Sequence, residues 1–141
     1  MNLLRTIQAQ EDATWVERLF TEGPHDGEWV PLWPYQLPFP FSLQEDVVGG
    51  FAYLIYRRHI VGYARIQQVI DQGTTYVGTE GQPVRSGQSV VMDGAYIPMP
   101  AKLRDIEVRG FTGIRYTPRD LHKLGSTALR AALKTARVKV Y

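Results

Sequence analysis

The spacing of hydrophobic and polar residues changes along the chain, and this spacing predicts which elements form. The clearest pattern is a pair of apolar runs, Phe51 to Tyr56 and Ile60 to Val69, separated by a basic tripeptide at 57–59. Short runs rich in aromatic and β-branched residues are typical of buried strands. They predict two strands joined by a tight turn. Gly62, inside the second run, predicts a bulge or the close approach of another backbone.

Three further stretches have strand character. Asn2 to Ile7 is a short apolar start, and Ser89 to Met92 is an apolar run closed by an Asp-Gly turn signal. Residues 103–118 alternate polar and apolar positions around Ile106 and Val108, which also predicts a strand. Residues 71–88, rich in Gly, Thr and Gln, predict a loop or a weak hairpin.

Helical spacing is found near both ends of the chain. Residues 8–20 place apolar residues three and four positions apart, with acidic residues near the start, which predicts a helix with Trp15 in the core. Residues 117–141 show a second helical pattern. In this stretch Gly125 and Ser126 predict either a kink or a second helix start with Ser126 as N-cap. The order of elements favours a small α+β domain with a mostly antiparallel sheet.

The segment Gly27 to Phe41, GEWVPLWPYQLPFPF, fits neither pattern. It contains two Trp, one Tyr, two Phe and four Pro, which excludes a helix interior or a central strand. Its rings either plug the core or line a cleft for a flat ligand. We expect Trp29, Trp33 and Tyr35 to contact ligand, because the prolines stiffen the backbone that presents them.

Composition limits the classes of site. The 141 residues suit one domain spanning 1–141, and the absence of Cys excludes disulfides and thiolate metal sites. The three His are scattered, so we expect no metal site, although a carboxylate-only Mg²⁺ site stays open. We also expect no cofactor. The sequence shows neither a signal peptide nor an apolar run of about 20 residues, which predicts a cytoplasmic protein without a membrane partner. The sequence leaves the oligomeric state open.

Charge is unevenly distributed. Residues 1–100 contain six basic and eleven acidic residues, whereas residues 101–141 contain ten and three. A basic C-terminal part indicates either an anionic partner or a solvated helix face. For the first alternative we expect phosphate contacts from four residues: Arg109, Arg115, Arg119 and Lys123.

The strand pair in GGFAYLIYRRHIVGYARI resembles the core pair of the PUA-like group, which includes the ASCH and EVE domains. These are small β-barrels with flanking helices that bind RNA or modified bases. The resemblance implies a mostly antiparallel β-barrel or sheet with flanking helices, and a nucleic acid or nucleotide as partner. We expect Tyr63 to line the ligand cleft. Asp93 or Glu107 would accept from a base edge or act as acid or base, unless both are surface charges.

Residues 3–70 also resemble GNAT-type acetyltransferases, which implies binding of acetyl-CoA. LLRTIQAQEDATWVERLF is similar to their first strand and helix, and VGYARI to the strand before the cofactor. Candidates for the pyrophosphate loop, which uses backbone N–H groups at a helix start, are Arg109 to Tyr116 and Leu124 to Ala128. The first has the wrong spacing, and the β-rich stretch 71–110 stands where this loop should follow. A protein-interaction domain is a third alternative, and no complete catalytic motif assigns a reaction.

Overall fold

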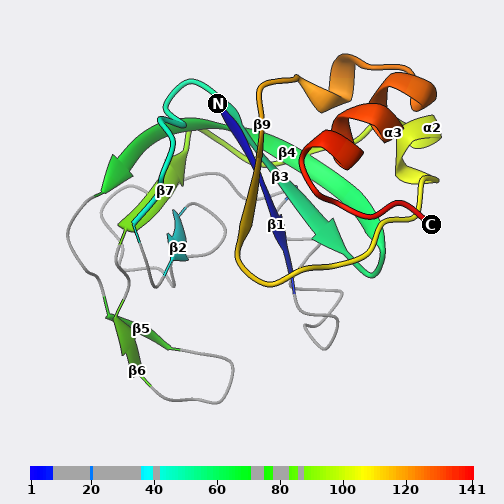
Figure 1. Cartoon of the computed structure of the whole chain (residues 1–141). Helices are drawn as coiled ribbons and strands as arrows, with labels where there is room; N and C mark the ends of the chain where they lie inside the picture. Colours follow the sequence, from blue (N-terminus) through cyan, green and yellow to red (C-terminus); the bar gives the residue numbers. More distant parts are fainter. Residues whose placement is uncertain (8–19, 21–35, 40–41, 71–74, 78–82, 86–87) are drawn as a thin grey trace.

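The computed structural model describes residues 1–7, 20, 36–39, 42–70, 75–77, 83–85 and 88–141. Among the residues so described, strands dominate the first hundred positions and the helices α2 and α3 lie in the C-terminal part (Figure 1). The elements are β1 (Asn2–Thr6), β2 (Gln36–Phe39), β3 (Phe51–Tyr56), β4 (His59–Ile70), β5 (Thr75–Val77), β6 (Pro83–Arg85), β7 (Gln88–Met92), β8 (Ile97–Pro98), α2 (Ala101–Arg104), β9 (Ile114–Thr117), the 3₁₀-helix η1 (Leu121–Lys123) and α3 (Ser126–Thr135).

Seven strands form one mixed sheet with the order β2-β7-β4-β3-β1-β9, and β8 pairs with β4 beside this path. β1 and β3 run parallel, and the other pairs are antiparallel. Among the described strands, β2 and β9 stay unpaired at the two edges, so the sheet is open. The α+β class with a mostly antiparallel sheet and flanking helices is confirmed. Of the two predicted forms, the described strands make a sheet and not a closed barrel.

The β3–β4 hairpin is the centre of this sheet. The predicted strand pair is confirmed, with Tyr56 opposite His59 across a two-residue turn. The register shifts after Leu54, where the pairing moves from Gly62 to Ile60. A side chain at Gly62 would meet the Phe20 ring and, at 2.8 Å, the Ile97 carbonyl oxygen. Gly62 therefore marks both the bulge and the close approach that its place in a strand predicts.

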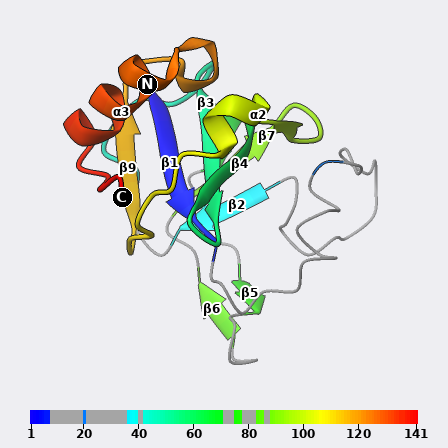
Figure 2. The same ribbon diagram turned by 90° about the vertical axis from the view of Figure 1, so that its right-hand side faces the viewer.

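The two faces of the sheet bury separate apolar clusters. One face carries Leu4, Phe51, Tyr53 and Ile55, which pack against residues of α2, η1 and α3. Figure 2 shows these helices lying together over one side of the strands. The opposite face buries a second cluster: Leu3, Ala52, Leu54, Tyr56, Ala64, Ile66, Val90, Met92 and Tyr96. Alternation along β1 and β3 divides the residues in this way, because successive side chains point to opposite faces.

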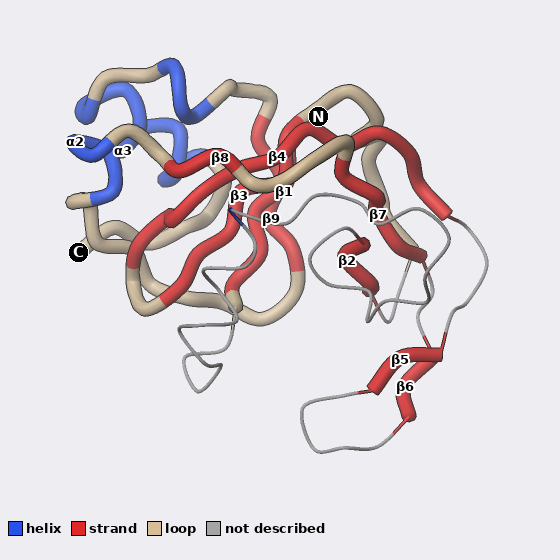
Figure 3. Tube along the Cα trace, turned by 180° about the vertical axis from the view of Figure 1, so that it is seen from behind, coloured by secondary structure: helices blue, strands red, loops and turns tan. Residues whose placement is uncertain are grey.

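The short β5–β6 hairpin lies outside the main sheet. Its two strands pair only with each other, and they project at the end of the molecule away from the helices (Figure 3). The expected weak hairpin in 71–88 is confirmed for these residues.

Two local predictions in the C-terminal part need correction. The alternating stretch 103–118 does not form one strand: α2 ends at Arg104, residues 106–108 make only isolated bridges, and β9 begins at Ile114. The second helix start is confirmed, but its N-cap is Gly125 and not Ser126, and no side chain caps it. Ser126 is instead the first helical residue.

Candidate functional site

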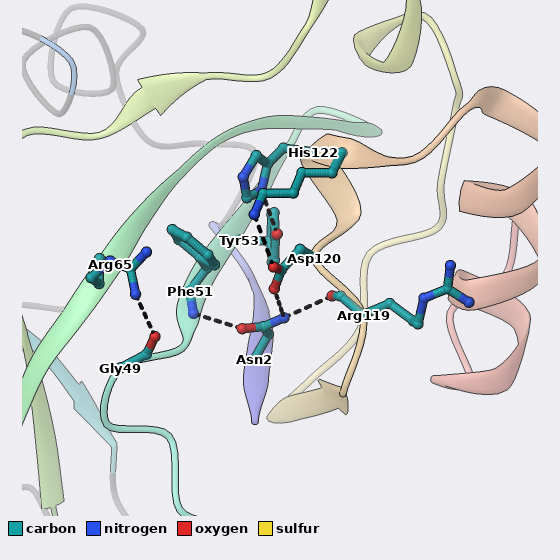
Figure 4. A network of polar contacts seen from close by, with 9 residues as sticks. Asn2, Gly49, Phe51, Tyr53, Arg65, Arg119, Asp120 and His122 are labelled. Atoms are coloured by element: carbon teal, nitrogen blue, oxygen red, sulfur yellow. Dashed lines mark hydrogen bonds and ion pairs between the residues drawn. The ribbon is translucent and has the colours of Figure 1, made fainter.

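Asn2 joins three parts of the chain at one end of the β3–β4 hairpin. Its side chain is 3% exposed. The Oδ1 atom accepts from the Phe51 N–H at 2.8 Å, and Nδ2 donates to the Arg119 carbonyl at 2.7 Å and to Asp120 Oδ1 at 3.1 Å (Figure 4). The start of β1, the start of β3 and the segment before η1 are therefore held in one arrangement.

His122 of η1 is fixed by a buried tyrosine. The Tyr53 hydroxyl lies 2.7 Å from His122 Nδ1, and Tyr53 is fully buried. Burial raises the pKa of the Tyr53 hydroxyl, while backbone N–H groups of His122 and Leu121 oppose that rise. Of the two possible directions of this bond, donation from the Tyr53 hydroxyl makes Nδ1 the acceptor. Neutral His122 then carries its own proton on Nε2.

The His122 ring belongs to an aromatic group at the edge of the helix layer. Tyr63 stacks on it with ring centroids 4.0 Å apart and planes 13° from parallel. Phe51 meets it edge-on at 4.7 Å. Arg65, opposite Phe51 on β4, places its guanidinium 4.6 Å from the Phe51 ring and donates to the Gly49 carbonyl at 2.8 Å. We call Phe51, Tyr63, Arg65 and His122 the aromatic site.

A pocket of about 370 Å³ adjoins the aromatic site. It shares Asn2 and Asp120 with the hydrogen-bond network described above, and its other lining residues are Met1, Val48, Gly49, Gly50 and Pro118. The pKa of Asp120 is lowered, mainly by the hydrogen bond from Asn2, so this carboxyl is ionised at neutral pH. Lys123 lies 3.4 Å from it. The pocket thus combines a fixed acceptor with a nearby cation, and Met1, Val48 and Pro118 give it apolar side chains.

The structure brings together two of the predicted site residues. Tyr63 stacks within the aromatic site, and Lys123 reaches the Asp120 carboxylate beside it. Only the backbone of Asp93 contacts this region: its N–H donates to the Arg65 carbonyl at 3.0 Å. The Asp93 side chain is exposed. Glu107 lies elsewhere, paired with Arg58 at 3.7 Å.

The three predicted phosphate-binding arginines are dispersed. Arg119 contributes its carbonyl to the network, and its side chain points away from the aromatic rings (Figure 4). Arg115 lies against the Phe111 ring at 4.6 Å and donates to the Thr112 and Ile114 carbonyls at 3.3 Å. Arg109 is exposed and pairs through its backbone with Lys139.

The remaining predictions concern four aromatic residues outside the described part of the chain and a candidate pyrophosphate loop at the start of a helix. Trp15, Trp29, Trp33 and Tyr35 lie outside the residues that the structure describes. Residues 124–128, the candidate pyrophosphate loop, do stand at the beginning of α3. The parallel pair β1–β3 is hydrogen-bonded over four register positions.

Sequence reasoning missed Asn2, His122, Arg65 and Asp120. The Asn2 contacts join residues 117 and 118 positions apart, a separation that no local pattern reveals. One signal was present for Arg65: a charged residue alternating with apolar ones on a strand marks a side chain that reaches the surface.

No protein-family model, curated protein or solved structure matches the chain. Within the described ranges, no helix has both the length and the apolar composition to cross a bilayer. The same residues contain no cluster of His, Asp or Glu arranged to hold a metal ion. The function therefore has to be argued from the aromatic site itself.

Proposed function

We propose that this chain binds nucleic acid or a nucleotide at the aromatic site. The stacked Tyr63–His122 pair carries the proposal, because the cations Arg65 and Lys123 both act on His122, and Asp120, two residues before His122, lines the pocket. A nucleotide has a flat base and an anionic phosphate. Aromatic rings bind the first by stacking, and Arg and Lys bind the second.

Each group has a defined part in this proposal. A base stacks on the outer side of the Tyr63–His122 pair, and its edge reaches toward the pocket. The ionised Asp120 accepts from an amino or imino group of that edge, because a carboxylate pairs with exocyclic amines of bases. Arg65, held over Phe51 by its bond to Gly49, contacts phosphate, and so does Lys123. The Nε2–H of His122 is a further donor toward the ligand.

Calorimetric titration with the four ribonucleoside 5′-monophosphates tests the proposal. We expect binding to at least one of them, weakened by about 1–3 kcal/mol in Tyr63→Leu, as for loss of one stacked base. Tyr63→Phe keeps the ring and should bind like the unchanged chain. Tyr116→Leu is the matched control, because Tyr116 is also partly buried but packs on the other face of the sheet. Equal binding by Tyr63→Leu and the unchanged chain would contradict the proposal.

Acetyl-CoA is the competing ligand, and calorimetric titration with acetyl-CoA distinguishes this alternative from nucleotide binding. The sequence has no Gly-rich pyrophosphate loop of the correct spacing after β4, so we expect no heat of binding from acetyl-CoA. Micromolar binding that is lost in a Gly125→Pro variant would instead assign the start of α3 to a pyrophosphate.

A further inference from the structure

The turn of the β3–β4 hairpin has an unusual composition. It consists of Arg57 and Arg58, with φ angles of 48° and 72°. A two-residue hairpin turn with positive φ at both positions is a type I′ turn, for which Asn-Gly and Asp-Gly are the usual residues. Side chains with a Cβ are disfavoured in this left-handed conformation. Two adjacent arginines therefore stand where the backbone favours residues without their charge or length.

The C-terminal segment brings further basic residues to the same turn. The Arg58 carbonyl accepts from the Val108 N–H at 2.7 Å, and Val108 bridges to Val140. Because Val108 points inward, its neighbour Arg109 faces outward, as does Lys139, whose carbonyl accepts from the Arg109 N–H at 2.8 Å. Arg104 joins this group through its carbonyl, 2.5 Å from His59 Nδ1. We call Arg57, Arg58, Arg104, Arg109 and Lys139 the turn patch.

The turn patch keeps an excess of positive charge on exposed side chains. It has five cations, and the same segments contain two exposed acidic residues, Asp105 and Glu107. Only Glu107 is paired with the patch, through Arg58 at 3.7 Å, and both partners of that pair are largely exposed. The exposed Tyr141 ring lies 5.0 Å from the Arg58 guanidinium. Arginines beside an exposed ring suit an extended anion that carries flat groups.

We propose that the turn patch binds the phosphate backbone of single-stranded nucleic acid, so that the ligand of this chain is a polynucleotide. This inference rests on the proposed function and adds a second contact region to it. Arg57 follows Phe51 by six positions along β3, about 20 Å at 3.3 Å per residue. At the duplex spacing of about 3.4 Å per phosphate a stacked strand needs about six nucleotides to cover that distance, and an extended single strand needs fewer. Ligands shorter than this length reach the aromatic site alone.

The test uses the double variant Arg57→Asn/Arg58→Gly, which gives the turn its preferred residues and removes two charges. Anisotropy titrations with labelled 12-nucleotide single strands of RNA and DNA should show at least fivefold weaker binding than the unchanged chain. The slope of log affinity against log salt should fall by about 1.4, the value for two lost phosphate contacts on a single strand. Mononucleotide binding should stay the same.

The matched control is Arg130→Gln/Lys134→Gln, which removes two exposed charges from α3 of the same basic segment. It should bind the 12-nucleotide strands within twofold of the unchanged chain. Equal weakening by both double variants means that net charge alone acts, and this overturns the inference. Full 12-nucleotide binding by the turn variant overturns it as well.

Two further outcomes show whether the turn patch alone or also the proposed function is wrong. If mononucleotides bind and a 12-nucleotide strand binds no more tightly, the turn patch is overturned while the proposed function stands. If neither binds at low salt, both fail together. Phosphatidylserine vesicles are titrated in parallel: turn-dependent binding to vesicles without binding to the strands assigns the patch to a lipid surface and overturns the inference.

Discussion

The two ends of the β3–β4 hairpin both present arginine beside aromatic rings, but they fix these side chains differently. At the open end, where Phe51 pairs with Arg65, contacts from β1 and η1 hold the groups in place. Arg65 is tied to the Gly49 carbonyl. At the turn end, Arg57 and Arg58 are positioned by their own left-handed backbone, and their side chains extend into solvent.

This difference teaches what each end can recognise. A preorganised aromatic group loses little conformational freedom when a ligand binds, so it can distinguish flat ligands by shape and edge. Long exposed arginines adapt to a backbone of repeated charges but carry no information about bases.

Removing the amide at the open end should have the largest effect. Asn2→Leu leaves the buried Phe51 N–H and the Arg119 carbonyl without their partner, and each such group costs about 1–3 kcal/mol. We expect the free energy of unfolding in urea to fall by about 3 kcal/mol. Gln67→Leu, an exposed amide on β4, is the control and should change it little. A loss below about 1 kcal/mol for Asn2→Leu would mean that this network does not hold the open end together.

Crowding at Gly50 should give the next effect. A Cβ there would contact the Met1 carbonyl and lie 2.9 Å from Asn2 Oδ1, whereas Gly94 has open space around the same position. Gly50→Ala should lower the free energy of unfolding by about 2 kcal/mol, the cost of forcing atoms into packed surroundings. Gly94→Ala should stay within about 0.5 kcal/mol of the unchanged chain. The melting temperatures of Gly50→Ala and Gly94→Ala measure this difference. Equal melting temperatures would contradict tight packing at the open end of the hairpin.

The turn end should respond with the opposite sign. Arg57→Asn/Arg58→Gly relieves two left-handed residues, each disfavoured by roughly 1–2 kcal/mol, and loses only an exposed ion pair and ring contacts. We expect the free energy of unfolding to rise by about 1 kcal/mol. A destabilised variant would show that these arginines stabilise the fold and are not retained at its expense.

The smallest effect concerns the pH dependence of stability, since His122 is only partly buried. Burial lowers the pKa of His122 below its ordinary value of 6.5, while Asp120 opposes this and Lys123 and Arg65 add to it. The unfolded chain therefore takes up the proton first as pH falls below 6.5, so this group's contribution to stability is present above that pH and lost below it. Urea midpoints measured from pH 7.5 to 5 should decline less in His122→Phe than in the unchanged chain. If the urea midpoints of the two proteins declined equally with pH, His122 would not be the group responsible.

Local pattern predicted much of the fold. The apolar runs gave β3 and β4, and Gly62 gave the bulge between them, because burial of both faces leaves a direct signature in strand composition. The turn was predicted at 57–59 although its residues are poor turn formers, since the strands on either side determine where the chain reverses. The prediction of one strand over 103–118 was wrong, because the alternation there reflects contacts with α3 and the C-terminal segment and not pairing within one strand.

The candidate site was less accessible to sequence reasoning. Tyr63 and Lys123 were predicted, but the residues that hold them are Asn2, His122 and Asp120, which come from opposite ends of the chain. Their roles depend on the parallel pairing of β1 with β3, a contact between distant segments. Net charge indicated a basic C-terminal part, whereas the structure disperses those cations: Lys123 lies beside Asp120, and Arg104, Arg109 and Lys139 lie in the turn patch.

A double-variant cycle tests most directly whether one strand uses both ends of the hairpin. Affinities for a 12-nucleotide single strand and for a mononucleotide are measured for four proteins: the unchanged chain, Tyr63→Leu, Arg57→Asn/Arg58→Gly and the combination of the two. For distant sites on one bound strand, the two losses should multiply for the 12-nucleotide strand, and only Tyr63→Leu should weaken the mononucleotide. If Tyr63→Leu leaves both ligands bound as before, the aromatic site is not where this chain recognises bases, and the central claim is contradicted.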